Sequence, residues 1–309
     1  MSGPRDPQDS LLNAFTVDVE DYFQVENFAR AIPRRDWEQF ASRIVPNTRR
    51  VLELLARHGV RGTFFILTWN AERIPDLVRE IQAAGHEIAA HGHEHRLVYE
   101  QTPAEFTADI EKARALLVAL TGTPVLGYRA PSYSITVASR WAFARLKAAG
   151  FAYDSSVYPI RRRRYGIPAA PRHPHPIDGL IEFPMTTLRI GRLNIPAASG
   201  GYLRLLPLAV SRAAIAQQNR AGHPAVVNVH PWELDPEQPR IGGGHLGGFT
   251  HYANLTRTAA RLSALLREFR FGTMRESLHQ AGYALAANPP PAAGPAAGAR
   301  SLDDPRSLP

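Results

Sequence analysis

The feature that most constrains the fold is the alternation of short apolar runs with amphipathic segments. Residues 14–19, 62–67 and 87–90 form short runs that are mostly apolar, which are typical of strands buried on both faces of a sheet. Residues 48–58 and 74–84 have apolar side chains at helical spacing, and a glycine follows each segment. The order strand, helix, strand, helix, strand favours a parallel sheet covered by helices.

The same alternation continues along the chain. Thr102-Pro103-Ala104-Glu105 is a capping box with proline at the first helical position, and it predicts a helix to about Leu120. Further strands are expected at 124–128, 180–183 and 225–229, and further helices at 137–149, 206–220 and 254–269. The sequence therefore predicts an α/β fold whose largely parallel sheet is closed or half-closed by helices.

The composition limits the chemistry and the partners. The chain has 309 residues and no cysteine, so a metal would have to bind His, Asp or Glu. Its net charge of +8 favours polyanions, but Arg161 to Arg164 are not interleaved with aromatic residues and are expected to form a solvated loop. No nucleic-acid partner is expected. Residues 1–10 lack an apolar signal core and no apolar run is long enough to span a membrane, which predicts a cytoplasmic protein.

The ends of the chain differ in composition from its middle. Residues 1–10 are polar and are expected to be flexible, and residues 286–309 are rich in Pro, Ala, Gly and Ser and are expected to be disordered. Residues 11–285 are expected to form the folded domain.

Ionisable residues follow four of the expected strands. Asp18, Glu20 and Asp21 come at the end of the first, and His91-Gly92-His93-Glu94-His95 follows the third. Arg129 and His230 follow two later strands. Because the carboxyl ends of parallel strands meet at one edge of a sheet, these side chains are expected to lie together.

The carboxylates and histidines favour a metal site. Adjacent acids repel each other, and a cation would relieve that repulsion. His91 and His95 are four residues apart, with His93 between them and free to point elsewhere. Two imidazoles and one carboxylate leave open positions for water and substrate, as a catalytic metal site requires. The alternatives are an exposed acidic loop or helix cap and structural histidines.

Arg129 and His230 each have a chemical and a structural interpretation. Arg129 could orient a catalytic carboxylate, or it could form a structural ion pair. His230 follows a strand of largely β-branched residues and could act as a general acid, or it could be a packed loop histidine.

Taken together, these residues resemble the NodB-type polysaccharide deacetylase family, and the resemblance covers residues 11–285. Five segments carry it in the family's order: Thr16-Val17-Asp18, His91 with His95, Arg129-Ala130-Pro131, Tyr153-Asp154-Ser155-Ser156, and His230. The segments 18–23 and 230–233 resemble the subgroup linked to exosortase and exopolysaccharide loci. Val19 interrupts the usual pair of adjacent aspartates, so either Glu20 or Asp21 would stand at the metal-binding acid, with Glu20 favoured.

The resemblance implies an irregular (β/α) barrel, often seven-stranded, and a divalent metal such as zinc. It implies N-deacetylation of N-acetylated amino sugars in a polysaccharide or its precursor, within exopolysaccharide biosynthesis. In the implied site, Asp18 is the base, Arg129 orients Asp18, and His230 is the acid. The implied metal ligands are His91 and His95 together with Glu20 or Asp21. The residues implied to contact the substrate are Tyr133, Asp154 and Trp232.

Two other functions fit the same pattern. One is a small-molecule amidohydrolase of the allantoinase type on the same scaffold, and the other is a non-catalytic carbohydrate-binding protein. The glycine-rich segment 240–249 is expected to be either a mobile lid or an ordinary loop.

Overall fold

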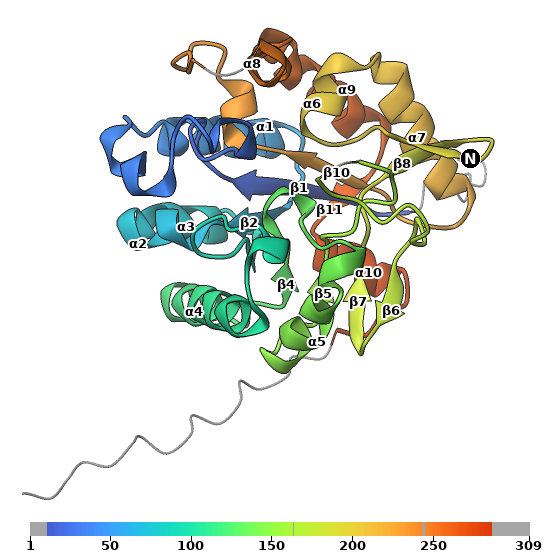
Figure 1. The fold of residues 1–309 in the computed structure, drawn as a ribbon. Coiled ribbons are helices and arrows are strands. Elements are labelled where there is room, and N and C mark those ends of the chain that lie inside the picture. Colours follow the sequence, from blue (N-terminus) through green and yellow to red (C-terminus); the bar gives the residue numbers. More distant parts are fainter. Residues whose placement is uncertain (1–10, 163, 243–244, 286–309) are drawn as a thin grey trace, which may run out of the picture.

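One curled sheet forms the centre of the molecule in the computed structural model, which describes residues 11–162, 164–242 and 245–285 (Figure 1). Its nine strands follow the order β10-β1-β2-β3-β4-β5-β7-β6, and β11 pairs with β1. A separate hairpin consists of β8 and β9. The strands are β1 Asn13–Val19, β2 Thr63–Ile66, β3 Glu87–Ala90, β4 Gly127–Tyr128, β5 Tyr153–Asp154, β6 His175–Ile177, β7 Leu180–Glu182, β8 Thr187–Ile190, β9 Leu193–Pro196, β10 Val226–Val229 and β11 Phe271–Gly272.

The sheet confirms the expected barrel-like α/β class. Seven consecutive strands, from β10 through β1 to β7, pair in parallel, which matches the expected seven-stranded ladder. Two further strands extend it: β6 is an antiparallel edge strand, and β11 adds two residues beside the start of β1. The sheet is therefore a half-barrel of nine strands.

Helices pack around the outside of the half-barrel (Figure 1). They are α1 Ile44–Arg57, α2 Thr68–Arg73, α3 Pro75–Ala83, α4 Pro103–Thr121, α5 Trp141–Ala148, α6 Gly200–Leu205, α7 Leu208–Arg220, α8 His245–Tyr252, α9 Thr258–Glu268 and α10 Met274–Gln280. Their apolar faces join the strands in the main hydrophobic core, which contains Val51, Ile81, Ile110 and Leu262.

Two expected elements are shorter or broken in the structure. The strand expected at 124–128 pairs only over Gly127–Tyr128, although Val125 and Leu126 are buried in the core. The helix expected at 137–149 is divided into a 3-10 turn, Val137–Ser139, and α5, with Arg140 between them.

The register of the parallel ladder explains where the ionisable residues lie. Val19 pairs with Ile66, Ile66 with Ala90, and Ala90 with Tyr128. These strand ends form one row across the sheet, so the residues that follow them emerge along one rim. On the other side of β1, Val17 pairs with Val229, which places His230 on the same rim.

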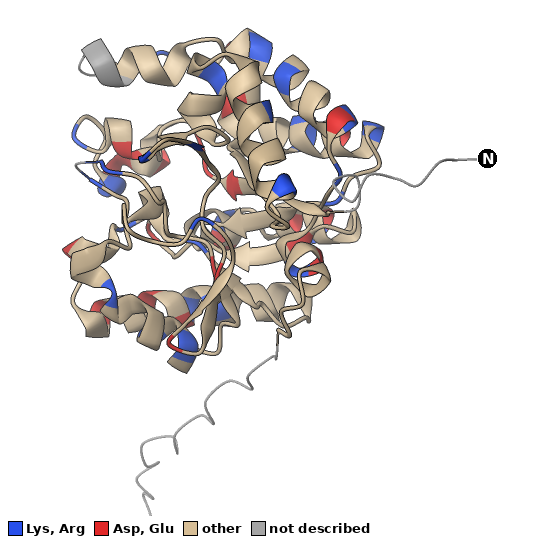
Figure 2. Cartoon of the chain, turned by 90° about the vertical axis from the view of Figure 1, so that its right-hand side faces the viewer, with Lys and Arg blue, Asp and Glu red and all other residues tan. Residues whose placement is uncertain are grey.

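The basic residues do not form one dense patch in the view of Figure 2, where they are spread over helices and loops among acidic ones. Among the described residues, no helix is both long and apolar enough to cross a membrane. The expected flexible start, 1–10, and the expected tail, 286–309, lie outside the described residues.

The capping box predicted at the start of α4 is present. The Thr102 hydroxyl accepts a hydrogen bond from Glu105 N–H, and the Glu105 carboxylate accepts one from Thr102 N–H. At the other end, Gly122 adopts a left-handed conformation with φ of 65° and ends the helix.

Replacing Thr102 with alanine should lower the free energy of unfolding by about 1 kcal/mol, because it removes the acceptor for Glu105 N–H. Urea denaturation measures the change. Thr107→Ala is the matched control, since Thr107 bonds only to the Pro103 carbonyl within the same helix. Equal losses in the two variants would contradict the role of the cap.

Candidate metal and catalytic site

Glu20, His91 and His95 form a buried group at the rim of the sheet. Glu20 follows β1, and both histidines lie in the loop after β3. The Nε2 atoms of His91 and His95 lie 2.8 Å and 3.0 Å from the same Glu20 oxygen, Oε1. Three ligand atoms thus lie within 4.8 Å of one another.

The hydrogen bond on the other side of His91 shows that this group fits a metal. His91 Nδ1 lies 2.8 Å from the Arg129 carbonyl oxygen, which can only accept, so Nδ1 carries the proton. A neutral His91 therefore turns its Nε2 lone pair toward the Glu20 carboxylate. Two acceptors at this distance repel each other unless a cation or a proton lies between them. The donor set, two imidazole nitrogens and a carboxylate, suits a divalent transition metal.

Electrostatics keep Glu20 ionised. Burial alone would raise the pKa of its carboxyl, but the charge of His95 and the hydrogen bonds that both rings donate when they are protonated hold this pKa well below its usual value.

The backbone between the two histidines turns sharply. Gly92 has a φ of 73°, and a Cβ there would lie 2.9 Å from Asp109 Oδ2, so glycine is required. His95 also lies in the left-handed region, with a φ of 53°. His93 points away, and its ring nitrogens contact the Thr68 hydroxyl and the Lys112 amine.

Asp21, the rival metal ligand in the sequence, lies outside this group. One carboxylate oxygen accepts from Tyr22 N–H, and the other accepts from the Ser42 hydroxyl at 2.6 Å and from Arg43 N–H at 2.9 Å. The expectation that Asp21 might serve as a ligand is corrected by these contacts, which anchor the segment before α1. Glu20 is the acid that the structure brings to His91 and His95.

Asp18 is held by a buried ion pair with Arg129. Arg129 Nη1 lies 2.7 Å from Asp18 Oδ1, and the Arg129 side chain is fully buried. Its guanidinium also donates to the Ser155 carbonyl and hydroxyl and lies over the Phe65 ring. Because the remaining donors are satisfied, the guanidinium fixes the direction of the Asp18 carboxylate.

Asn228 is a site residue that the sequence interpretation missed. Its amide donates to Asp18 Oδ2 at 2.9 Å, and its carbonyl accepts from Arg129 at 2.7 Å. The sequence pattern could have indicated this role, because Asn228 is the only polar residue of β10, and β10 is a fully buried parallel strand.

His230 lies beside Asp18 and is supported from behind. Its Nε2 is 3.7 Å from Asp18 Oδ2, and its Nδ1 is 2.7 Å from Glu233, which in turn pairs with the buried Arg204. Burial opposes protonation of His230, but the hydrogen bond to Glu233 and the charges of Glu20, Glu233 and Asp18 raise its pKa to about 9. This raised pKa favours the protonated form of His230 at neutral pH.

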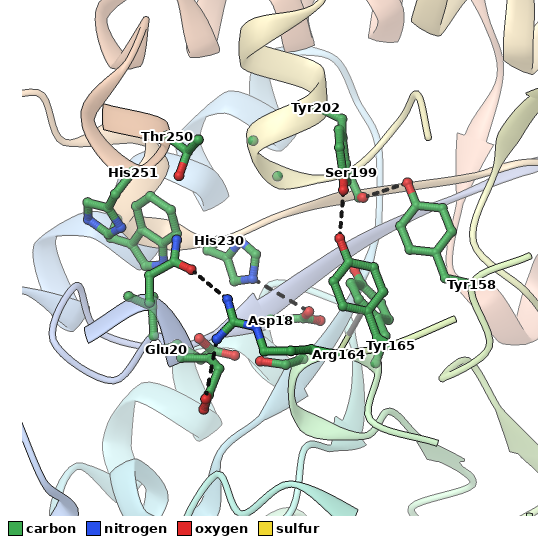
Figure 3. Close-up of a pocket in the computed structure, with 18 of the residues that line it drawn as sticks. Asp18, Glu20, Tyr158, Arg164, Tyr165, Ser199, Tyr202, His230, Thr250 and His251 are labelled. Atoms are coloured by element: carbon green, nitrogen blue, oxygen red, sulfur yellow. Dashed lines mark hydrogen bonds and ion pairs between the residues drawn. The ribbon is translucent and has the colours of Figure 1, made fainter. Parts of the chain in front are cut away.

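A cavity of about 970 Å³, part of which is open solvent, reaches this site (Figure 3). Asp18, Glu20 and His230 lie at its base. Its walls carry five tyrosines, which are Tyr99, Tyr133, Tyr158, Tyr165 and Tyr202. Two pairs of wall hydroxyls are in contact: Tyr158 with Ser199 and Tyr165 with Tyr202 (Figure 3).

Two of the three expected substrate residues, Tyr133 and Trp232, line this cavity. Trp232 stacks between His230 and His251. Asp154 does not line it: its carboxylate is buried and accepts from the Ser156 hydroxyl and backbone. Because neighbouring side chains of a strand point to opposite faces, Ser155 faces Arg129 and Asp154 points away from the cavity.

The arginine run borders the cavity, and so does helix α8, which begins within the glycine-rich segment. Arg161, Arg162 and Arg164 are exposed as expected, but Arg164 also lines the cavity. The segment expected to be a loop becomes helical at His245, where α8 begins, and Thr250 and His251 from this helix reach the cavity wall.

Two family models match the chain. One, described as polysaccharide deacetylase, matches residues 39–151, and the other, described as a domain of unknown function (DUF3473), matches residues 155–279. The chain contains a polysaccharide deacetylase domain. The matched deacetylase region holds His91, His95 and Arg129, whereas His230 comes from the second region and Asp18 precedes both. The parallel strands place these five residues along one rim of the sheet.

Curated relatives and solved structures agree with this domain. A peptidoglycan-N-acetylglucosamine deacetylase of Bacillus cereus is 35% identical over 75 residues, which cover 24% of this chain and 27% of the relative. A chitooligosaccharide deacetylase of Rhizobium leguminosarum is 46% identical over 44 residues, 14% of this chain and 20% of the relative. The chain thus spans well under half the length of these relatives.

The fold is also found in a crystal structure. A Mycobacterium smegmatis protein, named as a candidate polysaccharide deacetylase, superposes with a TM-score of 0.57 at 18% identity, over 94% of this chain and 97% of that chain. This likeness supports the fold.

Glu20→Gln should weaken zinc binding by at least about tenfold, because the charge facing both imidazoles is lost. Asp21→Asn is the matched control and should leave zinc affinity within about twofold while lowering stability by roughly 1–3 kcal/mol, since its hydrogen bonds are structural. Competition with a chromophoric chelator and thermal denaturation measure the two effects. A larger loss of affinity in Asp21→Asn would overturn the assignment.

Proposed function

We propose that this protein removes acetyl groups from N-acetylated amino sugars in a polysaccharide or its precursor, in a metal-dependent reaction. One observation carries the proposal: Asp18 is fixed by Arg129 and Asn228 beside a cationic His230 and next to the Glu20, His91 and His95 group. A base, an acid and a candidate metal site thus share one cavity. The relatives named above act, by their names, on peptidoglycan N-acetylglucosamine and on chitooligosaccharides.

Glu20, His91 and His95 would hold the metal, and zinc suits these ligands. A divalent metal bound there would supply a Lewis acid that polarises the acetyl carbonyl and makes water a better nucleophile near neutral pH.

Asp18 acts as the base in this proposal. Arg129 and Asn228 each bind one of its carboxylate oxygens and hold the carboxylate directed into the cavity. As water adds to the acetyl carbon, Asp18 accepts the proton that the water loses.

His230 acts as the acid. It enters the reaction protonated, because Glu233 raises its pKa. As the carbon–nitrogen bond breaks, His230 donates its Nε2 proton to the leaving nitrogen. The products are acetate and a free amino sugar.

The polymer is proposed to be an exopolysaccharide, from the resemblance of residues 18–23 and 230–233 to that subgroup. The wide cavity with its tyrosine walls supports a sugar substrate, because aromatic rings pack well against sugar rings.

The reaction can be tested with purified protein and an N-acetylglucosamine oligosaccharide, by measuring released acetate. Activity should disappear with a chelator and return with zinc. Asp18→Asn should lower kcat by at least about a hundredfold while zinc affinity is retained, because the base is lost and Glu20 is not.

Asp76→Asn, at an exposed acid on α3, is the control and should keep wild-type kinetics. Hydrolysis of ureides but not of oligosaccharide would instead indicate a small-molecule amidohydrolase. Sugar binding without turnover in the zinc-loaded protein would indicate a carbohydrate-binding protein.

The pH dependence should depend on Glu233. Because His230 must be protonated, activity should decline as the pH rises through its pKa of about 9. Glu233→Gln removes the carboxylate that raises this pKa, so the alkaline limb of kcat/KM should move to lower pH by about one unit or more. The exposed Glu237→Gln serves as control. An unmoved limb in Glu233→Gln would exclude His230 as the group that titrates there.

A further inference from the structure

The orientation of Asn228 is fixed by its neighbours. Its Oδ1 lies 2.7 Å from Arg129 Nη1, and a guanidinium can only donate, so the oxygen must face the arginine. The amide nitrogen therefore faces the other way, and its two protons go to Asp18 Oδ2 and to the Tyr133 hydroxyl, each at 2.9 Å.

This orientation sets the role of Tyr133. The Tyr133 oxygen accepts a hydrogen bond from the Asn228 amide, so the proton of the Tyr133 hydroxyl must point elsewhere. Among the described residues no acceptor for that proton is found, and Tyr133 lines the cavity that contains Asp18 and His230. Burial and the charge of Asp18 raise the pKa of this phenol well above its usual value, so the proton is retained throughout the working pH range.

The backbone that presents Tyr133 is strained. Ser132 and Tyr133 have φ values of 52° and 55°, and two consecutive non-glycine residues in the left-handed region cost roughly 1–3 kcal/mol each. Such strain persists where the surrounding structure requires it. Here the left-handed backbone directs the Tyr133 side chain toward Asn228 and the cavity. The Tyr133 ring packs edge-on against Tyr158.

We propose that Tyr133 is a substrate-contacting residue whose hydroxyl donates a hydrogen bond to a ring or hydroxyl oxygen of the sugar rather than to its acetyl group, and that Asn228 positions it. One amide group joins Tyr133 to the Asp18 oxygen that also lies nearest His230. The Tyr133 hydroxyl therefore lies on the same side of Asp18 as His230. Because His230 is the proposed proton donor to the leaving amine, the amine and the sugar ring attached to it would be held on that side. This inference rests on the proposed deacetylase function.

Tyr133→Phe tests the inference, because phenylalanine keeps the ring and removes only the hydroxyl. The measurements are kcat/KM on an N-acetylated oligosaccharide and the inhibition constant of its deacetylated product, which retains the sugar oxygens but lacks the acetyl group. The variant should lose roughly tenfold in kcat/KM and bind product about tenfold more weakly, with unchanged zinc affinity and melting temperature.

Tyr22→Phe is the matched control, since its hydroxyl bonds to the Ala41 carbonyl outside the cavity. It should keep wild-type values of both constants. Unchanged constants in Tyr133→Phe would overturn the inference, and so would a lower kcat with unchanged product affinity, which would place the hydroxyl at the acetyl group. A wild-type protein without deacetylase activity would instead overturn the proposed function itself.

Discussion

The buried ion pair between Asp18 and Arg129 is the interaction on which the rest of the rim depends. The guanidinium contacts the end of β1 through Asp18, the loop after β5 through Ser155, and β10 through Asn228. Removing one partner of such a pair leaves an uncompensated buried charge and costs about 3–5 kcal/mol. Arg129 therefore holds three strand ends together, and its backbone carbonyl also orients His91. Stability and the geometry of the proposed reaction thus share one side chain.

The two halves of the site are electrostatically distinct but adjacent. On one side, two imidazole nitrogens converge on one Glu20 oxygen, an arrangement that calls for a cation. On the other side, Arg204 and Glu233 support His230, whose raised pKa favours the protonated form that the proposed acid requires. Asp18 lies between the two sides. The region matched by the domain of unknown function supplies Asn228, His230, Glu233 and Arg204, so it completes this site.

The sequence predicted the strand-end residues well, because ionisable groups directly after apolar runs must emerge at the rim of a parallel sheet. It could not decide between Glu20 and Asp21, since that choice depends on how the chain turns after β1. Asp154 was placed in the cavity wrongly, because only the strand register determines which of two neighbouring side chains faces Arg129. Tyr158, Tyr165 and Tyr202 come from loops and a short helix without periodicity, and nothing local in the sequence brings them together.

The most direct test of the account is to locate the metal by anomalous X-ray scattering from crystals of the zinc-loaded protein. The account predicts one zinc ion coordinated by Glu20, His91 and His95, with Asp18 beside it and still paired to Arg129. Zinc coordinated by Asp21, or zinc absent from the Glu20, His91 and His95 group in crystals of a catalytically active sample, would contradict it.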